Sequence, residues 1–284
     1  MIDNHINNPK SIKFYVKKYL ESSKDELNNK VILDIPAGNG ATTKLLLNLG
    51  AKAEPFDLFP EYFMLENVTC KRADISEKIP VADHYADMVI CQEGIEHISD
   101  QLNAFKEFNR VLKNGGKLLI TTPSYSSLSA KLSYLLFESE SRKQMPPNEA
   151  DDIWMPDNSG TGKIYYGHIF MIGLQKLRVL GKLAGFKIND NKYVRLSIGS
   201  LFLFPFFYPF IFTHSLVNYY RNLRKDKTLK TGIRKRIYKE QLRMNLRPRN
   251  LVNKHTFVVF EKEEEADSVD FRSEDVIKQF DKIM

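Results

Sequence analysis

The sequence has few of the residues that build disulfide frameworks or zinc sites. Among its 284 residues there are two cysteines, Cys70 and Cys91, and both lie in apolar or strand-like runs. Their separation does not match a zinc motif, so we expect reduced thiols in a cytoplasmic protein. Internal repeats are also lacking. Residues 1–10 are polar and contain Pro9, which argues against a secretory signal in this segment.

The formal net charge of +7 comes from one region of the chain. Residues 218–254 hold thirteen Lys/Arg against two acids, whereas residues 261–284 hold nine acids against four Lys/Arg. The rest of the chain is therefore nearly neutral. This distribution argues against a nucleic-acid footprint over the whole surface, and we expect nucleic acid to be an unlikely partner.

Residues 31–41 form the segment around which the other motifs are arranged. A buried-strand pattern leads into a turn that carries Gly38 and Gly40, and a helical pattern follows over residues 41–49. Glycines let a backbone approach a ligand closely, and the N-terminus of the helix adds hydrogen-bond donors. A second short strand, residues 51–57, ends in Asp57 about 20 residues after the turn, where an acid can bind ribose hydroxyls.

Strand and helix patterns then alternate, which predicts an α/β domain with a parallel central sheet. Further strands are expected at residues 68–73, 86–91, 117–122, 186–194 and 255–260, and helices at residues 11–27, 100–112 and 172–184.

Two insertions interrupt this pattern. Residues 124–166, with an apolar helix over 128–137, have the length of a lid or substrate loop. Residues 196–254 combine an apolar stretch with a basic one. We therefore divide the chain into a core of residues 1–195 and 255–262, the insertion 196–254, and an acidic tail of residues 263–284.

These motifs resemble those of the class I S-adenosylmethionine-dependent methyltransferases, over roughly residues 30–194 plus the last strand. The resemblance rests on the Asp34–Gly38–Gly40 turn, the strand-end acids and the helix-turn at residues 108–116. It implies a doubly wound, Rossmann-like sheet of seven strands, six parallel and the last antiparallel, with S-adenosylmethionine as cofactor. The implied cofactor-binding residues are Asp34, Pro36, Gly38, Gly40, Asp57, Asp74, Ile75 and Gln92.

Within this set, the resemblance assigns the ribose to Asp57, the adenine amino group to Asp74 and the methionine end to Gln92. Pro36 departs from the family pattern, because it stands where the first glycine is common and fixes φ near −65°. A dinucleotide-binding oxidoreductase would instead require G-x-G-x-x-G, and Thr43 occupies the third glycine position.

The segment Glu93-Gly-Ile-Glu-His97 follows the fourth predicted strand. If it opens a helix, its two carboxylates and its imidazole share one face and can bind a divalent ion. The same spacing resembles the magnesium-type site of ubiquinone-biosynthesis O-methyltransferases and of small-RNA terminal 2′-O-methyltransferases, which add a later histidine. The predicted metal ligands are therefore Glu93, Glu96, His97 and His168. In a metal-free site, His97, His168 and Glu93 are the catalytic candidates, and purely structural roles for these side chains stay open.

Residues 196–217 contain no charged side chain and are long enough to span a membrane. However, predicted strands of one sheet flank the segment, so both of its ends must lie on the same side of any membrane. An interfacial hairpin kinked at Pro205 and Pro209 satisfies this condition, as does a lid or an oligomer interface. The basic stretch at residues 219–249 favours peripheral attachment of 196–254 to the anionic cytoplasmic face of a membrane.

The sequence thus predicts a methyltransferase that O-methylates a lipid-linked or apolar acceptor at the membrane surface. The alternatives are an RNA 2′-O-methyltransferase and a catalytically silent S-adenosylmethionine-binding module. The oligomeric state is left open.

Overall fold

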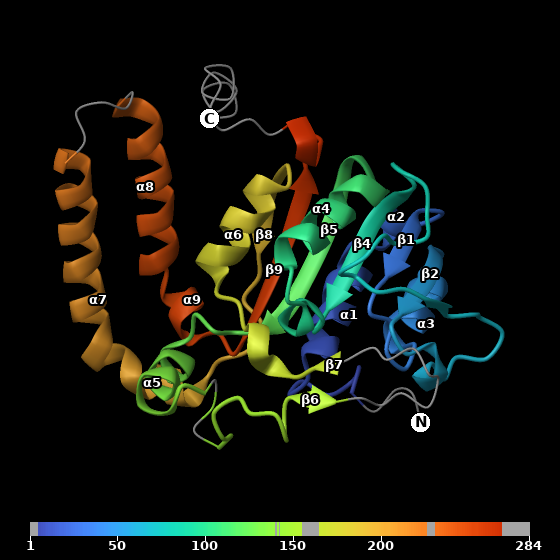
Figure 1. The fold of residues 1–284 in the computed structure, drawn as a ribbon, viewed down its shortest axis with the longest axis horizontal. Helices are drawn as coiled ribbons and strands as arrows, with labels where there is room; N and C mark the ends of the chain where they lie inside the picture. Colours follow the sequence, from blue (N-terminus) through green and yellow to red (C-terminus); the bar gives the residue numbers. More distant parts are fainter. Residues whose placement is uncertain (1–4, 140, 142, 155–164, 226–230, 269–284) are drawn as a thin grey trace.

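The computed structural model describes residues 5–139, 141, 143–154, 165–225 and 231–268, and it centres on a seven-stranded sheet (Figure 1). The strand order is β3-β2-β1-β4-β5-β9-β8, and β9 runs antiparallel to both of its neighbours. The α/β fold predicted from the sequence is therefore confirmed, with the antiparallel strand placed between β5 and β8. The strands are β1 Val31–Asp34, β2 Lys52–Asp57, β3 Lys71–Arg72, β4 Ala86–Gln92, β5 Leu112–Pro123, β8 Phe186–Asn191 and β9 His255–Lys262.

Helices cover both faces of this sheet, because successive residues of the central strands point to opposite sides. Leu33, Val89 and Leu118 lie in one buried cluster, with side chains of α4 (Gln101–Val111) and α6 (Leu174–Leu183). Their neighbours Ile32, Ile90 and Leu119 lie in the other, with α1 (Ile12–Ser22) and α3 (Ala41–Asn48). This alternation explains why the central strands are apolar at nearly every position.

Several predicted boundaries differ in the structure. The third strand is reduced to the two exposed residues of β3 at the sheet edge, whereas β5 extends back through Gly115 and Gly116. The first predicted helix divides at Ser23 into α1 and α2 (Lys24–Leu27), and Ser11 caps α1 by accepting a hydrogen bond from the Lys13 amide. Asp100 caps α4 in the same way, through the Asn103 amide.

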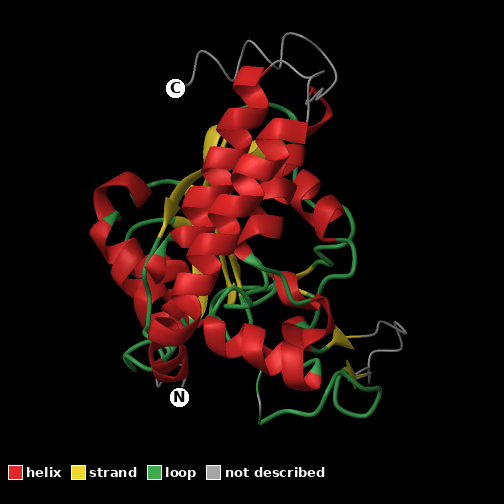
Figure 2. Cartoon of the chain, turned by 90° about the vertical axis from the view of Figure 1, so that its left-hand side faces the viewer, coloured by secondary structure: helices red, strands yellow, loops and turns green. Residues whose placement is uncertain are grey.

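The insertion before β9 forms two long helices, α7 (Ile198–Lys225) and α8 (Thr231–Leu246), followed by α9 (Pro248–Val252). Figure 1 shows α7 and α8 running alongside each other, and in Figure 2 helices of this part of the chain lie in front of the sheet. The kinked hairpin expected within the apolar stretch is not formed, since α7 continues through Pro205 and Pro209. The chain reverses direction between the apolar and the basic helix instead. Hydrogen bonds from Tyr208 Oη to the Leu246 carbonyl (3.1 Å) and from Asn245 Nδ2 to Ser215 Oγ (2.7 Å) join the two.

The insertion after β5 begins with α5 (Leu128–Phe137), at the bounds expected from the sequence. It ends with a small antiparallel ribbon of β6 (Ile153–Trp154) and β7 (Tyr165–Tyr166). The parts of the predicted lid at residues 140, 142 and 155–164, and of the acidic tail at residues 269–284, lie outside the described residues. The division into core, insertion and tail therefore stays a prediction.

Candidate active site

A cavity of about 700 Å³ opens at the carboxyl ends of β1, β2 and β4. The sheet order reverses between β1 and β4, which is where doubly wound sheets bind their ligands. Eight residues singled out from the sequence line this one cavity: Pro36, Gly38, Asp57, Asp74, Ile75, Gln92, Glu93 and His97. Asp34, Gly40, Glu96 and His168 lie behind or beside its wall.

Asp57 holds the glycine turn in place. One of its carboxylate oxygens accepts a hydrogen bond from the Gly38 amide at 2.8 Å, and the other accepts one from the Phe59 amide at 2.9 Å. Each oxygen keeps a second lone pair, so the same carboxylate can also bind a ligand's hydroxyls.

The two glycines of the turn have different neighbours. Gly38 has a φ of +53°, and a side chain there would meet no atom within 4 Å, so its backbone borders open space. Gly40, with a φ of +86°, is the N-cap of α3, and a Cβ there would lie 2.8 Å from the ring of Phe63. Gly40 is thus required by its own conformation and by packing.

Pro36 lies where two loops approach each other closely. A Cβ on Gly94 would lie 2.5 Å from Cδ of Pro36, so the turn after β1 and the loop after β4 are in contact. The irregular proline of the sequence motif therefore packs against a glycine that sequence reasoning did not single out.

Asp34 lies behind the turn, where its carboxyl is buried and accepts a hydrogen bond from Thr43 Oγ1 at 2.6 Å. Burial raises the pKa of Asp34 to about 7, and the bond to Thr43 and the charge of Lys13 oppose that shift in part. The threonine that argued against a dinucleotide site thus ties α3 to the end of β1.

Lys13 was missed by the sequence analysis, which gave its helix a packing role. From α1 its side chain reaches the cavity wall, where Nζ donates to Asn39 Oδ1 at 3.4 Å. Burial lowers its pKa, whereas the nearby charges of Asp34 and Glu93 raise it. Among the described residues that line the cavity, Lys13 is the only lysine or arginine.

The remaining predicted cofactor residues are held by local hydrogen bonds. Asp74 Oδ1 accepts from both the amide and the hydroxyl of Ser76, at 2.9 and 2.5 Å. Ile75 beside it is buried. Gln92 Oε1 accepts from Thr42 Oγ1 at 3.2 Å, which couples the end of β4 to the first turn of α3.

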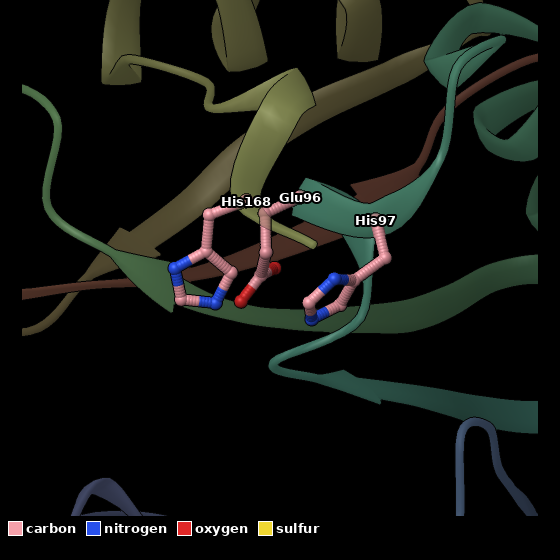
Figure 3. A group of neighbouring side chains, drawn as sticks. All are labelled: Glu96, His97 and His168. Atoms are coloured by element: carbon pink, nitrogen blue, oxygen red, sulfur yellow. The ribbon is translucent and has the colours of Figure 1, made fainter. Parts of the chain in front are cut away.

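Three of the four predicted metal or catalytic residues lie together. Figure 3 shows the Glu96 carboxylate between the imidazoles of His97 and His168, and one ligand atom from each lies within 4.8 Å of the other two. Glu93 is set apart. The predicted helix does not form, because Glu93 has a φ of +51° and only the short 3₁₀ turn η2, Ile95–His97, follows. Glu93 instead lines the cavity, with Oε2 3.8 Å from Nε2 of His255.

Backbone carbonyls orient His97. Its Nδ1 lies 2.7 Å from the Tyr166 carbonyl and 3.2 Å from that of Gly167, which immediately precedes the 3₁₀ turn η3, His168–Phe170. A carbonyl can only accept, so Nδ1 carries the proton and Nε2 is the basic nitrogen.

Glu96 is the buried member of the group. Neither of its oxygens makes a hydrogen bond of good geometry with the described residues. Burial, with the charge of Glu93, raises the pKa of Glu96 to about 8, and the nearby Thr122 hydroxyl lowers this pKa and so opposes in part the effect of burial. A buried carboxylate of this kind beside two imidazoles fits a divalent cation. This donor set suits a borderline ion such as Zn²⁺ better than Mg²⁺, which prefers oxygen ligands.

Aromatic rings that the sequence analysis did not select complete the wall. Tyr165 lies 4.7 Å from His97 and 6.1 Å from Phe59 between ring centroids, and Tyr62 and Tyr166 also face the cavity. Tyr165 and Tyr166 are the last residues of a long insertion without a regular pattern, so no spacing in the sequence indicates their position.

Comparison with known proteins agrees with this geometry. Residues 9–190 match a family model described as a methyltransferase domain. The chain is 32% identical over 97 residues to a demethylmenaquinone methyltransferase of Chlorobaculum parvum, covering 32% of this chain and 40% of that protein. It is 26% identical over 110 residues to a ubiquinone biosynthesis O-methyltransferase of Xanthomonas oryzae, covering 36% of this chain and 46% of that one. It thus spans less than half the length of these relatives.

A solved structure shares the fold. A SAM-dependent methyltransferase from Archaeoglobus fulgidus superposes with a TM-score of 0.51 and 14% identity, covering 90% of this chain and 97% of that one.

The buried Asp34 leads to a prediction about stability and pH. The folded chain keeps the Asp34 proton up to about pH 7, whereas an unfolded aspartate releases it near pH 3.9. Between these values the folded state binds more protons, so Asp34 lowers the free energy of unfolding as pH rises, by up to about 4 kcal/mol. Asp34→Asn removes this titration. We expect urea unfolding to show the variant gaining stability over the wild type from about pH 4 to pH 7, with no further gain above. Parallel pH profiles would contradict this assignment.

Proposed function

This chain belongs to the methyltransferase family whose model matches residues 9–190, and we propose that it methylates a hydroxyl oxygen of an apolar, lipid-linked acceptor at the cytoplasmic membrane surface. S-adenosylmethionine is the methyl donor. One observation carries the proposal: His97 belongs both to the wall of the cofactor cavity and to the Glu96–His97–His168 group. A base or metal ligand therefore lies where a methyl group and an acceptor would meet.

The cavity residues divide among the parts of the cofactor. Asp57 offers its remaining lone pairs to the ribose hydroxyls, and Asp74 with Ile75 receives the adenine. Gln92 and the backbone of Gly38 lie toward the methionine end. Lys13 supplies the positive charge that the methionine carboxylate requires.

Methyl transfer from a sulfonium needs an in-line approach of the acceptor atom, so much of the catalysis is positioning. A hydroxyl acceptor must also lose its proton. His97 Nε2 is the basic nitrogen of a ring that the Tyr166 carbonyl holds in orientation, and it accepts this proton. Glu96, His97 and His168 would hold a divalent cation, whose Lewis-acid chemistry would be to lower the pKa of the acceptor hydroxyl.

The surroundings of the cavity favour an apolar acceptor over RNA. Phe59, Tyr62 and Tyr165 provide an aromatic wall. Among the described lining residues, four acids, Asp57, Asp74, Glu77 and Glu93, stand against one lysine, Lys13, and such a rim repels a phosphate backbone. The names of the two relatives support a quinone-type acceptor, which is aromatic and apolar.

Attachment to a membrane is supported by the exposed face of α7. This helix is long and apolar enough to cross a membrane, and 6% of its most apolar window is buried. β8 precedes the insertion and β9 follows it, and the two strands pair in one sheet. Both ends of the insertion therefore lie on the same side of a membrane, which favours a helix lying at the interface over one that spans the bilayer. The exposed apolar side chains of α7 include Leu201, Phe202, Phe206, Phe207, Phe210 and Phe212. On α8 the basic residues Lys235, Lys239 and Arg243 are also exposed.

The proposed chemistry predicts the outcome of labelled methyl transfer. With labelled S-adenosylmethionine, we expect the wild type to label the lipid fraction of a host extract. We expect His97→Asn to lower the transfer rate about a hundredfold or more, because the proton acceptor is lost. His84, a histidine next to the C-terminal end of α4 and beside Lys262, supplies the matched control, and His84→Asn should act as wild type.

Other outcomes of this assay are equally informative. Label in RNA, or an unchanged rate for His97→Asn, would contradict the proposal, and no transfer to any fraction would favour a silent cofactor-binding module. Full activity after chelation would assign the Glu96–His97–His168 group to proton transfer alone. A loss of activity on chelation that a borderline ion reverses would assign the group to metal binding.

Membrane attachment is tested by flotation. We expect the protein to float with vesicles containing phosphatidylglycerol and less with phosphatidylcholine vesicles, since each basic residue near an anionic surface contributes about 1 kcal/mol. A Phe202→Ser, Phe206→Ser, Phe210→Ser triple variant should remain in the soluble fraction. Leu47→Ser with Val179→Ser removes exposed apolar side chains elsewhere and should not change flotation. A wild type that stays soluble with anionic vesicles would contradict attachment.

A further inference from the structure

A second cavity, of about 370 Å³, lies between α5 and α7, away from the cofactor cavity. Its long wall is hydrocarbon, formed by Leu128, Leu132, Leu135, Phe207 and Ile211. The volume falls in the range of small-ligand sites.

Polar side chains also line this groove. Lys131 contributes an ammonium group, and His214, Asn218 and Asn245 contribute an imidazole and two amides. The hydrogen bond from Asn245 to Ser215 holds α8 against α7 beside the groove. His214 is oriented by the bond between Nδ1 and the Phe210 carbonyl, at 2.9 Å. No aspartate or glutamate is present among the described residues that line the groove.

We propose that this groove binds one anionic phospholipid, with an acyl chain along the α5–α7 wall and the phosphate at Lys131. A hydrocarbon wall that carries one cation, with no carboxylate among the described lining residues, is complementary to a chain that carries a negative head group. The inference rests on the proposed membrane attachment, because a lipid must reach the groove from a bilayer.

The surroundings of the groove support this occupant. Leu135 is 76% exposed, and Tyr134, Leu136 and Phe137 on α5 are also exposed. On α7, Phe206 and Phe210 lie exposed near the groove residues Phe207 and Ile211. An acyl chain would therefore pass from the exposed apolar surface of α5 and α7 directly onto the hydrocarbon wall of the groove.

Adjacent residues of α7 provide a matched pair of variants. Ile211 lines the groove, whereas Phe210 is 66% exposed and is not among the groove residues. Ile211→Trp fills the groove, and Phe210→Trp adds similar bulk outside it. Lys131→Gln is a second variant, which removes the charge at an exposed position and leaves the hydrocarbon wall intact.

The test is calorimetric titration of the full chain with decanoyl lysophosphatidylglycerol below its micelle concentration. We expect saturable binding of one lipid per chain, weakened about tenfold or more in Ile211→Trp and unchanged in Phe210→Trp. Decanoyl lysophosphatidylcholine should bind several-fold more weakly to the wild type, and Lys131→Gln should abolish this preference. Sedimentation of the same samples should show no change of mass.

The proposal is overturned if the wild type shows no saturable binding, or if Ile211→Trp and Phe210→Trp behave alike. It is also overturned if Ile211→Trp changes the oligomeric state, because the groove would then be a contact between copies of the chain. The titration uses neither vesicles nor acceptor, so its failure is distinguishable from a failure of flotation or of methyl transfer.

Discussion

The hydrogen bond from the Gly38 amide to the Asp57 carboxylate is the interaction on which the cavity at the ends of β1, β2 and β4 depends. It joins the turn after β1 to the end of β2, and the other oxygen of Asp57 fixes the start of the next loop at Phe59. Thr43 and Asp34 secure the same turn from behind, and Gly94 lets Pro36 pack against the loop after β4. Three strand ends are thereby brought to one opening, as the parallel arrangement of β1, β2 and β4 requires.

A second constraint places the apolar insertion. Because β9 lies between β5 and β8, the chain must leave the sheet after β8 and return to the adjacent position. Residues 196–254 can only form an excursion from one end of the sheet, and the pairing of α7 with α8 accomplishes this reversal. The exposed apolar face of α7 thus belongs to the excursion between β8 and β9, and α5, which follows β5, supplies the other wall of the α5–α7 groove.

Much of the core and of the cavity lining could be predicted from the sequence, because both depend on short-range patterns. The apolar runs at residues 86–91 and 255–260 are typical of buried strands, and the positions of Gly38, Asp57 and Asp74 follow from where strands end. Lys13 could not be found in this way, since a lysine on an amphipathic helix has the same pattern whether it faces solvent or a cavity. Tyr165 reaches His97 only through tertiary packing.

The differences have physical causes of the same kind. Glu93 was grouped with Glu96 and His97 on the assumption of a helix, and its left-handed conformation directs it elsewhere. Pro205 and Pro209 indicated a hairpin, but a proline removes only one helical hydrogen bond, and α7 continues through both.

The measurement that tests the central claim most directly is calorimetric titration with S-adenosylmethionine. The account predicts one cofactor per chain and affinity at least about tenfold weaker for Asp57→Ala, because that change removes both the ribose acceptor and the anchor of the glycine turn. Asp190→Ala, at an exposed position on β8, should bind as wild type does. Absence of binding to the wild type, or equal affinity in Asp57→Ala, would contradict the account.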